Sequence, residues 1–99
     1  MELDELTFEI AKPLAGSRLQ VALPDGRQVT LSVERVEGFG GRASPGRRAP
    51  FSIFFRGPPD PILAQGIHAL RSEDVAWPAL FLVPIGRDER GTEYQAAFT

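Results

Sequence analysis

Few side chains in this sequence could carry out catalytic chemistry. His68 is the only histidine, and it lies between Ile67 and Ala69 in a segment with the pattern of a strand. A Ser-His-Asp arrangement needs a serine on a strained turn beside its base, and no serine lies in a Gly-x-Ser-x-Gly motif. We therefore expect no enzyme activity and no catalytic residue. The weaker alternative is a hydrolase in which His68 acts with Glu73 or Asp74.

The acidic residues do not form a recognisable metal site. The chain has no cysteine, which excludes a disulfide and any cysteine-ligated zinc or iron–sulfur centre. The adjacent pairs Glu73-Asp74 and Asp88-Glu89 lie in expected turns, where carboxylates are usually solvated. Two carboxylates across a cleft could serve glycoside hydrolysis, but no spacing selects two partners. We expect neither a metal nor a cofactor.

The glycine-rich segment 38–48 (GFGGRASPGRR) is the other candidate for binding. Its glycines are costly to order, so it should form a flexible loop. It has neither the Gly-Lys-Ser/Thr of a P-loop nor the strand–turn–helix frame of a dinucleotide site. Charge and stacking could hold a single-stranded nucleic acid here. The loop contacts would then be Phe39, Arg42, Arg47 and Arg48. The net charge of −2 instead favours a flexible loop that its arginines keep soluble and that binds no nucleic acid.

Alternating apolar residues predict the strands that would position these groups. Segments 18–23 and 28–34 alternate with a period of two, and Asp25-Gly26 between them predicts a hairpin with a tight primed turn. A β-bulge near Glu34-Arg35 would bring the apolar Val36 back into phase. Asp60-Pro61 predicts one helical turn over 62–64. Further strands are expected at 51–56, 67–71, 79–85 and 93–98, with a polar hairpin loop at 86–91.

Residues 1–14 should form a helical lid over one end of the sheet. Leu3, Leu6 and Ile10 are spaced as one stripe of a short helix. Alternatively, Thr7 could cap a single turn that follows it.

The element pattern predicts an all-β chain. No long helix is available as a parallel crossover, and short turns join neighbouring strands. We expect residues 1–99 to form one β domain with a short N-terminal helix. Its sheet would be a small antiparallel, partly closed barrel or a two-layer sandwich of about six strands.

Two of the expected strands carry apolar residues on both faces. In 51–56, alternation turns Phe54 outward, and in 79–85 an inward Phe81 would turn its neighbours outward. A cluster of exposed apolar residues marks a partner or self-association surface. The alternative is that these residues pack under the lid. The expected interaction surface consists of Phe54, Leu80 and Leu82, with Arg56 at its rim.

Charge and hydropathy limit the partners and the compartment. The net charge of −2 does not favour nucleic acid. The acidic start is the reverse of a signal peptide, and the longest apolar stretch, 75–85, is too short to span a bilayer. We expect no membrane contact and a cytoplasmic location, which the absence of cysteine also fits.

Several stretches carry a family resemblance. They are RAPFSIFFRGP at 48–58, Gln65-Gly66 and LFLVPIGRD at 80–88, together with Leu6-Thr7-Phe8 and the closing segment 94–98. In these the chain resembles an uncharacterised family of short bacterial proteins of about this length. Members of that family often occur alongside proteins with a phage tail-collar domain. The resemblance implies an accessory or structural part in a phage-derived or fibre-like assembly, and it implies no catalytic residue.

Two functions remain open. The first is a non-enzymatic structural or interaction module that self-associates as a homo-oligomer or docks on a phage-derived or fibre-like assembly. The alternative is binding of a small ligand or of single-stranded nucleic acid through the 38–48 loop and the mouth of the barrel.

Overall fold

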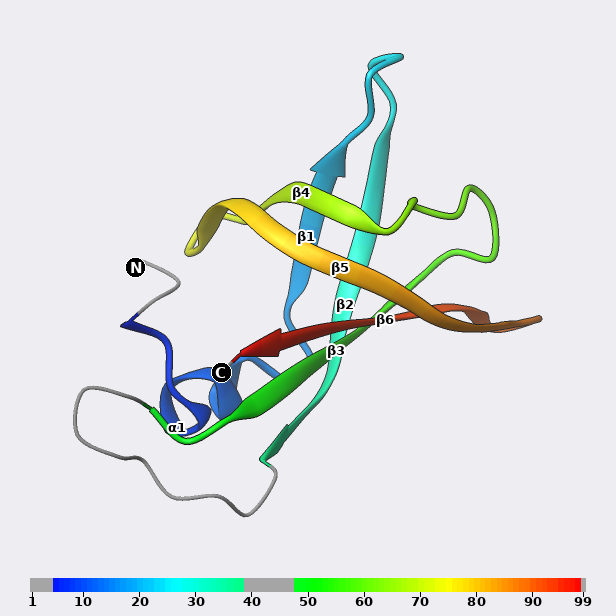
Figure 1. Cartoon of the computed structure of the whole chain (residues 1–99). Coiled ribbons are helices and arrows are strands. Elements are labelled where there is room, and N and C mark those ends of the chain that lie inside the picture. The colour runs from blue at the N-terminus through cyan, green and yellow to red at the C-terminus, as the bar shows by residue number, and fades with distance from the viewer. Residues whose placement is uncertain (1–4, 39–47, 99) are drawn as a thin grey trace.

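Six strands and a short N-terminal helix build the structure (Figure 1). The computed structural model describes residues 5–38 and 48–98. All strand pairs are antiparallel, and they close into a barrel in the order β1-β2-β3-β6-β5-β4. The expected small antiparallel barrel is therefore confirmed. The elements are α1 (Phe8–Ala11), the 3₁₀ turn η2 (Lys12–Leu14), β1 (Arg18–Ala22), β2 (Gln28–Gly38), β3 (Phe51–Gly57), β4 (Gly66–Arg71), β5 (Ala76–Asp88) and β6 (Gly91–Phe98).

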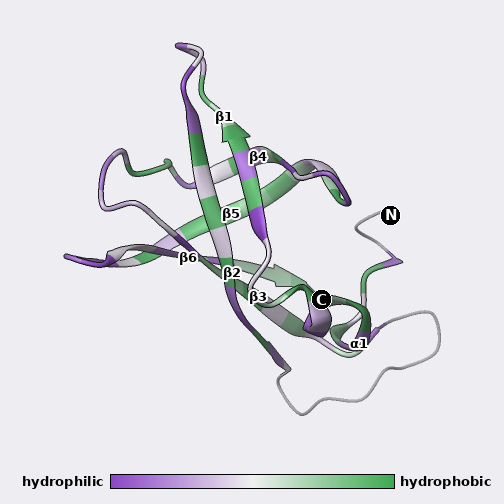
Figure 2. Cartoon of the chain, turned by 180° about the vertical axis from the view of Figure 1, so that it is seen from behind, coloured by the Kyte–Doolittle hydropathy of each residue, from purple (hydrophilic) through white to green (hydrophobic). Residues whose placement is uncertain are grey.

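The hairpin of β1 and β2 follows the predicted alternation, which Figure 2 shows as changes of colour along both strands. Its turn differs from the prediction. The Gly26 N–H donates to the Leu23 carbonyl at 3.0 Å, and of these residues Gly26 alone has a positive φ, +90°. This is the pattern of a three-residue hairpin loop that ends in a left-handed glycine, rather than a two-residue primed turn. Pro24 favours it, because proline suits the second position of an ordinary turn.

The predicted β-bulge in β2 is confirmed. The register between β2 and β3 slips between Val33 and Arg35, so Glu34 is the additional residue. After the slip Val36 lies opposite Ile53, and Arg35 lies opposite Phe54. Because opposite residues share a face of the sheet, the bulge turns Val36 inward and Arg35 outward.

Side chains from all six strands fill the barrel. Three aromatic residues show how tightly it is packed: the Tyr94 hydroxyl accepts a hydrogen bond from the Leu63 N–H at 2.8 Å, and the Phe51 and Phe98 rings stack with centroids 4.7 Å apart. The fully buried larger side chains are Leu6, Leu19, Val21, Leu31, Val33, Phe51, Ile53, Phe55, Leu70, Trp77, Leu82 and Tyr94.

The N-terminal lid follows the second of the two predicted arrangements. The Thr7 hydroxyl accepts a hydrogen bond from the Ile10 N–H at 3.3 Å and caps α1. Leu6 and Ala11 are buried, but Ile10 is exposed, so the predicted stripe is wrong at that position. Leu3 lies outside the described residues. Figure 1 shows α1 below the barrel, beside the end of β2 and the start of β3.

The prediction for β5 had the wrong phase. Leu80 and Leu82 point into the core and are buried, whereas Phe81 points outward. The register slips on both sides of this segment, opposite His68–Leu70 and again between Pro84 and Gly86. A run that is apolar on both faces gives no alternation from which its phase could be read.

The helical turn predicted after Asp60 is also wrong. Residues 58–65 form bends and extended chain without a helix. Leu63 is buried here, and its N–H bonds to the Tyr94 hydroxyl instead of capping a turn. Burial of one apolar side chain therefore outweighs the local preference of Asp-Pro for a helix start.

A substitution at Gly91 tests the close packing of β3 against the β5–β6 turn. Its φ is +138°, and a Cβ there would lie 2.1 Å from the Gly57 carbonyl oxygen. We expect Gly91→Ala to lower the free energy of unfolding by about 3 kcal/mol, because backbone strain and steric overlap act together. Urea denaturation followed by the fluorescence of Trp77, the single tryptophan, measures it. Gly86→Ala is the matched control, since no atom lies within 4 Å of its Cβ position. Equal stability of both variants would contradict the close approach.

Candidate functional site

The structure does not assemble the catalytic groups that the sequence offered. His68 is half-buried, and its Nε2 lies 2.7 Å from the Ala64 carbonyl oxygen. Glu73 and Asp74 are exposed in the β4–β5 turn. Among residues 5–38 and 48–98, no hydrogen bond joins His68 to an acidic side chain, and no group of three metal-ligating side chains occurs.

The outer surface of β4 and β5 carries the most exposed large apolar side chains of the barrel wall. Ile67 is 68% exposed and lies directly opposite Phe81, which is 50% exposed. Directly opposite side chains on neighbouring strands touch, so the two form one patch. Ala69 and the half-buried Val83 extend it along the same outward rows. We call Ile67, Ala69, Phe81 and Val83 the apolar face.

The surface predicted from the sequence is not the exposed one. Leu80 and Leu82 belong to the core. Phe54 does point outward, but it is only 7% exposed, because the Arg35 guanidinium lies 4.0 Å from the centre of its ring. Arg56 is partly buried and binds Glu34. The signal that could have identified the apolar face was the pairing of Ile67 with Phe81, which requires the strand register and not only the alternation.

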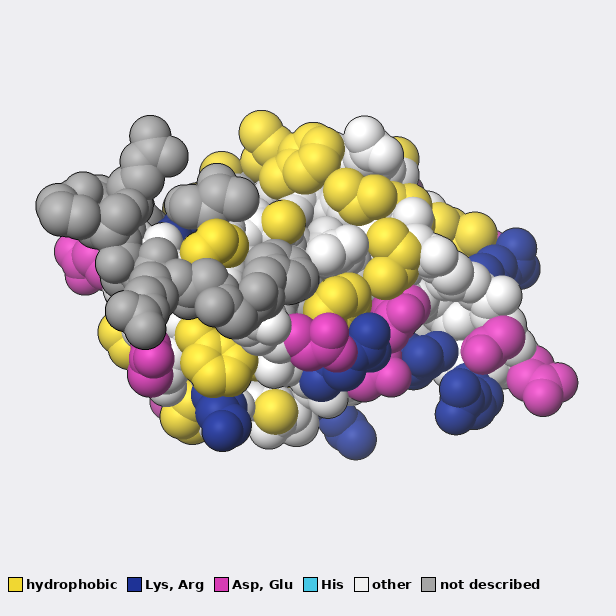
Figure 3. All heavy atoms as spheres, turned by 60° about the horizontal axis from the view of Figure 1, so that its bottom comes forward, with side chains coloured by type: hydrophobic (Ala, Val, Ile, Leu, Met, Phe, Trp, Pro, Cys, Tyr) yellow, Lys and Arg dark blue, Asp and Glu magenta, His cyan; other side chains and the backbone are white. Residues whose placement is uncertain are grey.

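A cluster of ion pairs lies further round the outside of the barrel, on β2, β3, β6, the end of β5 and the β5–β6 turn. One row of outward residues leads to it: Val83 faces Gln95, Gln95 faces Phe54, and Phe54 faces Arg35. Figure 3 shows hydrophobic side chains in a band and a group of arginine and acidic side chains beside it. The ion-pair cluster consists of Glu34, Arg35, Glu37, Arg56, Asp88, Arg90 and Glu93.

Each charged group of the cluster has an oppositely charged partner, and its four carboxylates outnumber its three arginines by one. Arg35 donates from Nη1 to Glu93 at 2.6 Å and from Nε to Glu37. Arg56 pairs with Glu34 at 3.2 Å and with Asp88 at 3.6 Å. Arginines that are bound in this way to carboxylates do not favour a phosphate ligand, and the cluster fits the polar rim of a contact surface.

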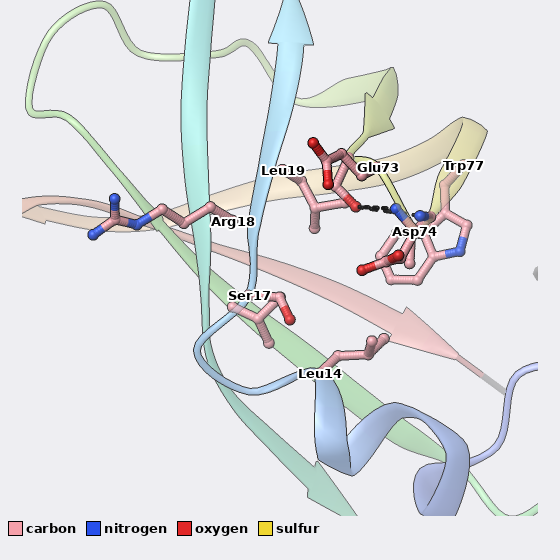
Figure 4. A pocket seen from close by; sticks show the side chains of 10 residues that line it. Leu14, Ser17, Arg18, Leu19, Glu73, Asp74 and Trp77 are labelled. Atoms are coloured by element: carbon pink, nitrogen blue, oxygen red, sulfur yellow. Dashed lines mark hydrogen bonds between the residues drawn. The ribbon is translucent and has the colours of Figure 1, made fainter.

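A pocket of about 280 Å³ opens at the barrel end beside η2 (Figure 4). The Ser17 carbonyl accepts from the Val33 N–H, and the Ser72 hydroxyl accepts from the N–H groups of Asp74 and Val75, whereas the buried Trp77 Nε1 has no hydrogen-bond partner in the described part of the chain. The lining residues are Leu14, Ser17, Arg18, Leu19, Val33, Ser72, Glu73, Asp74, Val75 and Trp77.

Of the four loop contacts predicted from the sequence, Phe39, Arg42 and Arg47 lie outside the described residues. Arg48 is described, and it holds the lid on the barrel. Its Nη1 donates to the Leu6 carbonyl at 2.6 Å, and its guanidinium carbon lies 5.2 Å and 5.7 Å from the centres of the stacked Phe98 and Phe51 rings. This position gives Arg48 a structural role.

A family model for a domain of unknown function, DUF6916, matches residues 6–98. The chain belongs to this family. The match spans α1, η2 and all six strands, and it confirms the resemblance to an uncharacterised family. Neither a curated protein nor a solved structure matches the chain. No helix in the described part of this DUF6916 domain is long and apolar enough to cross a membrane.

The ion-pair cluster gives this DUF6916 domain a pH dependence. The hydrogen bond from Arg35 holds the pKa of Glu93 below its ordinary value of 4.5, and the hydrogen bonds that Arg35 donates to Glu93 and Glu37 raise the pKa of Arg35. A lowered carboxyl pKa means that the ionised form is stabilised by folding. The contribution is complete above the unfolded-state pKa of Glu93 and is lost as the pH falls through its folded-state pKa.

We expect Arg35→Gln to raise the pKa of Glu93, which an NMR titration measures. It should also lower the free energy of unfolding at pH 7 by about 1 kcal/mol, a modest figure because the pair is partly exposed. Part of this difference should disappear at acid pH, where Glu93 is protonated in both proteins. The control is Arg27→Gln, which removes an exposed pair with Asp25 at the hairpin tip and should leave stability unchanged. An unaltered Glu93 titration would contradict the assignment.

Proposed function

We propose that this DUF6916 domain is a non-enzymatic protein-interaction module that binds through its apolar face. The observation that carries the proposal is the exposure of Ile67 and Phe81 in directly opposite positions on β4 and β5. Covering one such side chain is worth about 1.5–3 kcal/mol, and a partner would recover this energy. Scattered exposed apolar residues are common, but a neighbouring pair of large ones is typical of a contact surface.

The surroundings of the apolar face support this use. Interfaces commonly have an apolar centre and a polar rim. Here the outward row from Val83 through Gln95 and Phe54 ends at Arg35, in the ion-pair cluster. Arg56, which the sequence suggested as a rim residue, belongs to this cluster. Its charges are already paired, so a partner could cover the apolar face without stripping water from isolated charges.

The family resemblance suggests the setting for such a module. We propose that the domain is an accessory part of a phage-derived or fibre-like assembly. A small closed barrel suits that role, because closure removes most free strand edges and leaves the wall available for side-by-side contacts.

Charge placed at the centre of the apolar face should abolish binding. We expect a tagged Phe81→Glu domain to lose a protein that the wild-type domain captures from host lysate, because the variant would bury a carboxylate. Quantitative mass spectrometry of the captured proteins is the measurement. Ile10→Glu is the matched control, since Ile10 is an exposed isoleucine on α1. The proposal fails if both variants capture the same proteins as the wild type while their melting curves remain cooperative.

The pocket at the barrel end favours a second candidate function, binding of a small amphipathic amine. Figure 4 shows Arg18 extending away from the pocket, whereas Glu73 and Asp74 lie beside it with Leu14, Leu19 and Trp77. Apolar walls with acidic groups at the edge suit a cation with an apolar body.

Titration with phenethylamine, followed by Trp77 fluorescence, tests this function. We expect a saturable change that Asp74→Asn weakens, since the carboxylate supplies the charge, and that Arg18→Gln leaves in place. A linear, unsaturable change would exclude the pocket as an amine site. The nucleic-acid alternative is tested separately, by a mobility shift with single-stranded oligonucleotides at low salt, where electrostatic attraction is strongest.

A further inference from the structure

The barrel closes through a short seam between β1 and β4. Two residue pairs form it, Gln20 with Arg71 and Val21 with Leu70. On the side of β4 that faces away from β5, residues 66–69 therefore have no strand partner within the part of the chain that the structure describes. None of these four residues is buried. Their outward backbone groups form a free strand edge, which can accept another strand.

This edge lacks charged residues and proline, two of the features by which proteins usually protect free edges. Natural edge strands carry lysine, other charges or proline, which discourage pairing with other chains. Residues 65–69 (QGIHA) contain neither a charged residue nor a proline. The edge also carries Ile67, the most exposed large apolar side chain in the described structure. An edge without charge or proline that carries an exposed isoleucine suits a strand partner.

We propose that the β4 edge pairs antiparallel with the β4 edge of a second copy, about a two-fold axis at Ile67. The inference rests on the proposed function and names its partner. Opposite residues in a sheet share a face, so the outward Ile67 must meet an outward residue of the second copy. With the axis at Ile67, it meets its own counterpart, and Gly66 meets His68. The apolar faces then join into one row, Phe81–Ile67–Ile67–Phe81, across four strands.

Charge and shape both fit this self-pairing. No charged side chain meets its like, because the segment itself is uncharged and the two Arg71 residues stand at opposite ends of the ladder. The His68 ring lies opposite a glycine, so it meets no competing side chain. Pairing about a two-fold axis satisfies both free edges at once, which is the ordinary form of a homodimer interface.

A hollow beside the seam adjoins the free edge. Its volume is about 450 Å³, and its walls are mainly apolar. Ala69, which the proposed register brings opposite Gln65 of the second copy, lines this hollow. The lining residues are Gln20, Ala22, Gln28, Ala69, Leu70, Arg71, Ala76, Trp77 and Pro78.

The register makes the proposal testable by a charge swap. Gln65 and Ala69, both exposed, lie opposite each other across the two-fold axis, twice in each dimer. We expect the wild-type chain to be a dimer by light scattering and sedimentation. Gln65→Lys with Ala69→Lys should weaken dimerisation by at least about tenfold, because like charges then oppose each other at two places. Gln65→Glu with Ala69→Lys should restore it. Urea denaturation checks that both double variants are folded.

The outcomes separate this inference from the proposed function. A monomeric wild-type chain, or a dimer that responds equally to both double variants, overturns the pairing of β4 with β4. If such a chain still captures another protein in a manner that Phe81→Glu abolishes, the proposed interaction function stands and the partner is a different protein. A dimer that is weakened by the Lys/Lys variant and restored by the Glu/Lys variant supports the second copy and this register.

Discussion

Closure of the sheet determines which side chains of this domain meet water. A six-strand barrel must bend and twist its strands so that the first can meet the last, and here the ladders slip register at three points, in the β2–β3, β4–β5 and β5–β6 pairs. Each slip exchanges the inward and outward faces of the residues that follow it. The slip after Val33 turns Arg35 outward onto Phe54. The slips around β5 bring Leu80 and Leu82 into the core and leave Phe81 outside.

The sequence was sufficient for the fold class and for strands with clear alternation. In β1, β2 and β6 one face is apolar and the other polar, so both existence and phase of the strand could be predicted, as could the bulge at Glu34. In β5 the apolar residues occupy both faces, and the phase depends on slips at Pro78 and Pro84, where proline supplies no N–H to the ladder. The candidate surface was misplaced for that reason. Hydrophobicity alone could not choose between Phe81 and its two leucine neighbours.

A contact with arginine explains why Phe54, which was predicted to be exposed, is buried in the structure. The alternation correctly turned Phe54 outward, but a guanidinium plane covers the ring, so an outward aromatic residue is not an exposed one. Arg35, which covers the ring, lies on another strand, and the β-bulge brings it there. Local sequence patterns therefore could not predict this contact. Arg48 does the same at the other end of the barrel, where it lies against the stacked Phe51 and Phe98. In both places arginine combines cation–π contact with a hydrogen bond.

The seam and the apolar face follow from the same geometry. The β1–β2 hairpin extends past the barrel, and Figure 1 shows it projecting beyond β4, so β1 pairs with β4 near one end and leaves the rest of that edge free. Extending the seam along β4 would have removed the free edge, but it would have required β1 to bend away from β2, with which it pairs along its whole length. An incomplete closure is therefore the consequence of a long, straight first hairpin. The residues at the gap are uncharged and include the exposed Ile67, so a second strand could cover them, whereas the charged groups beyond Phe54 already form ion pairs within the chain.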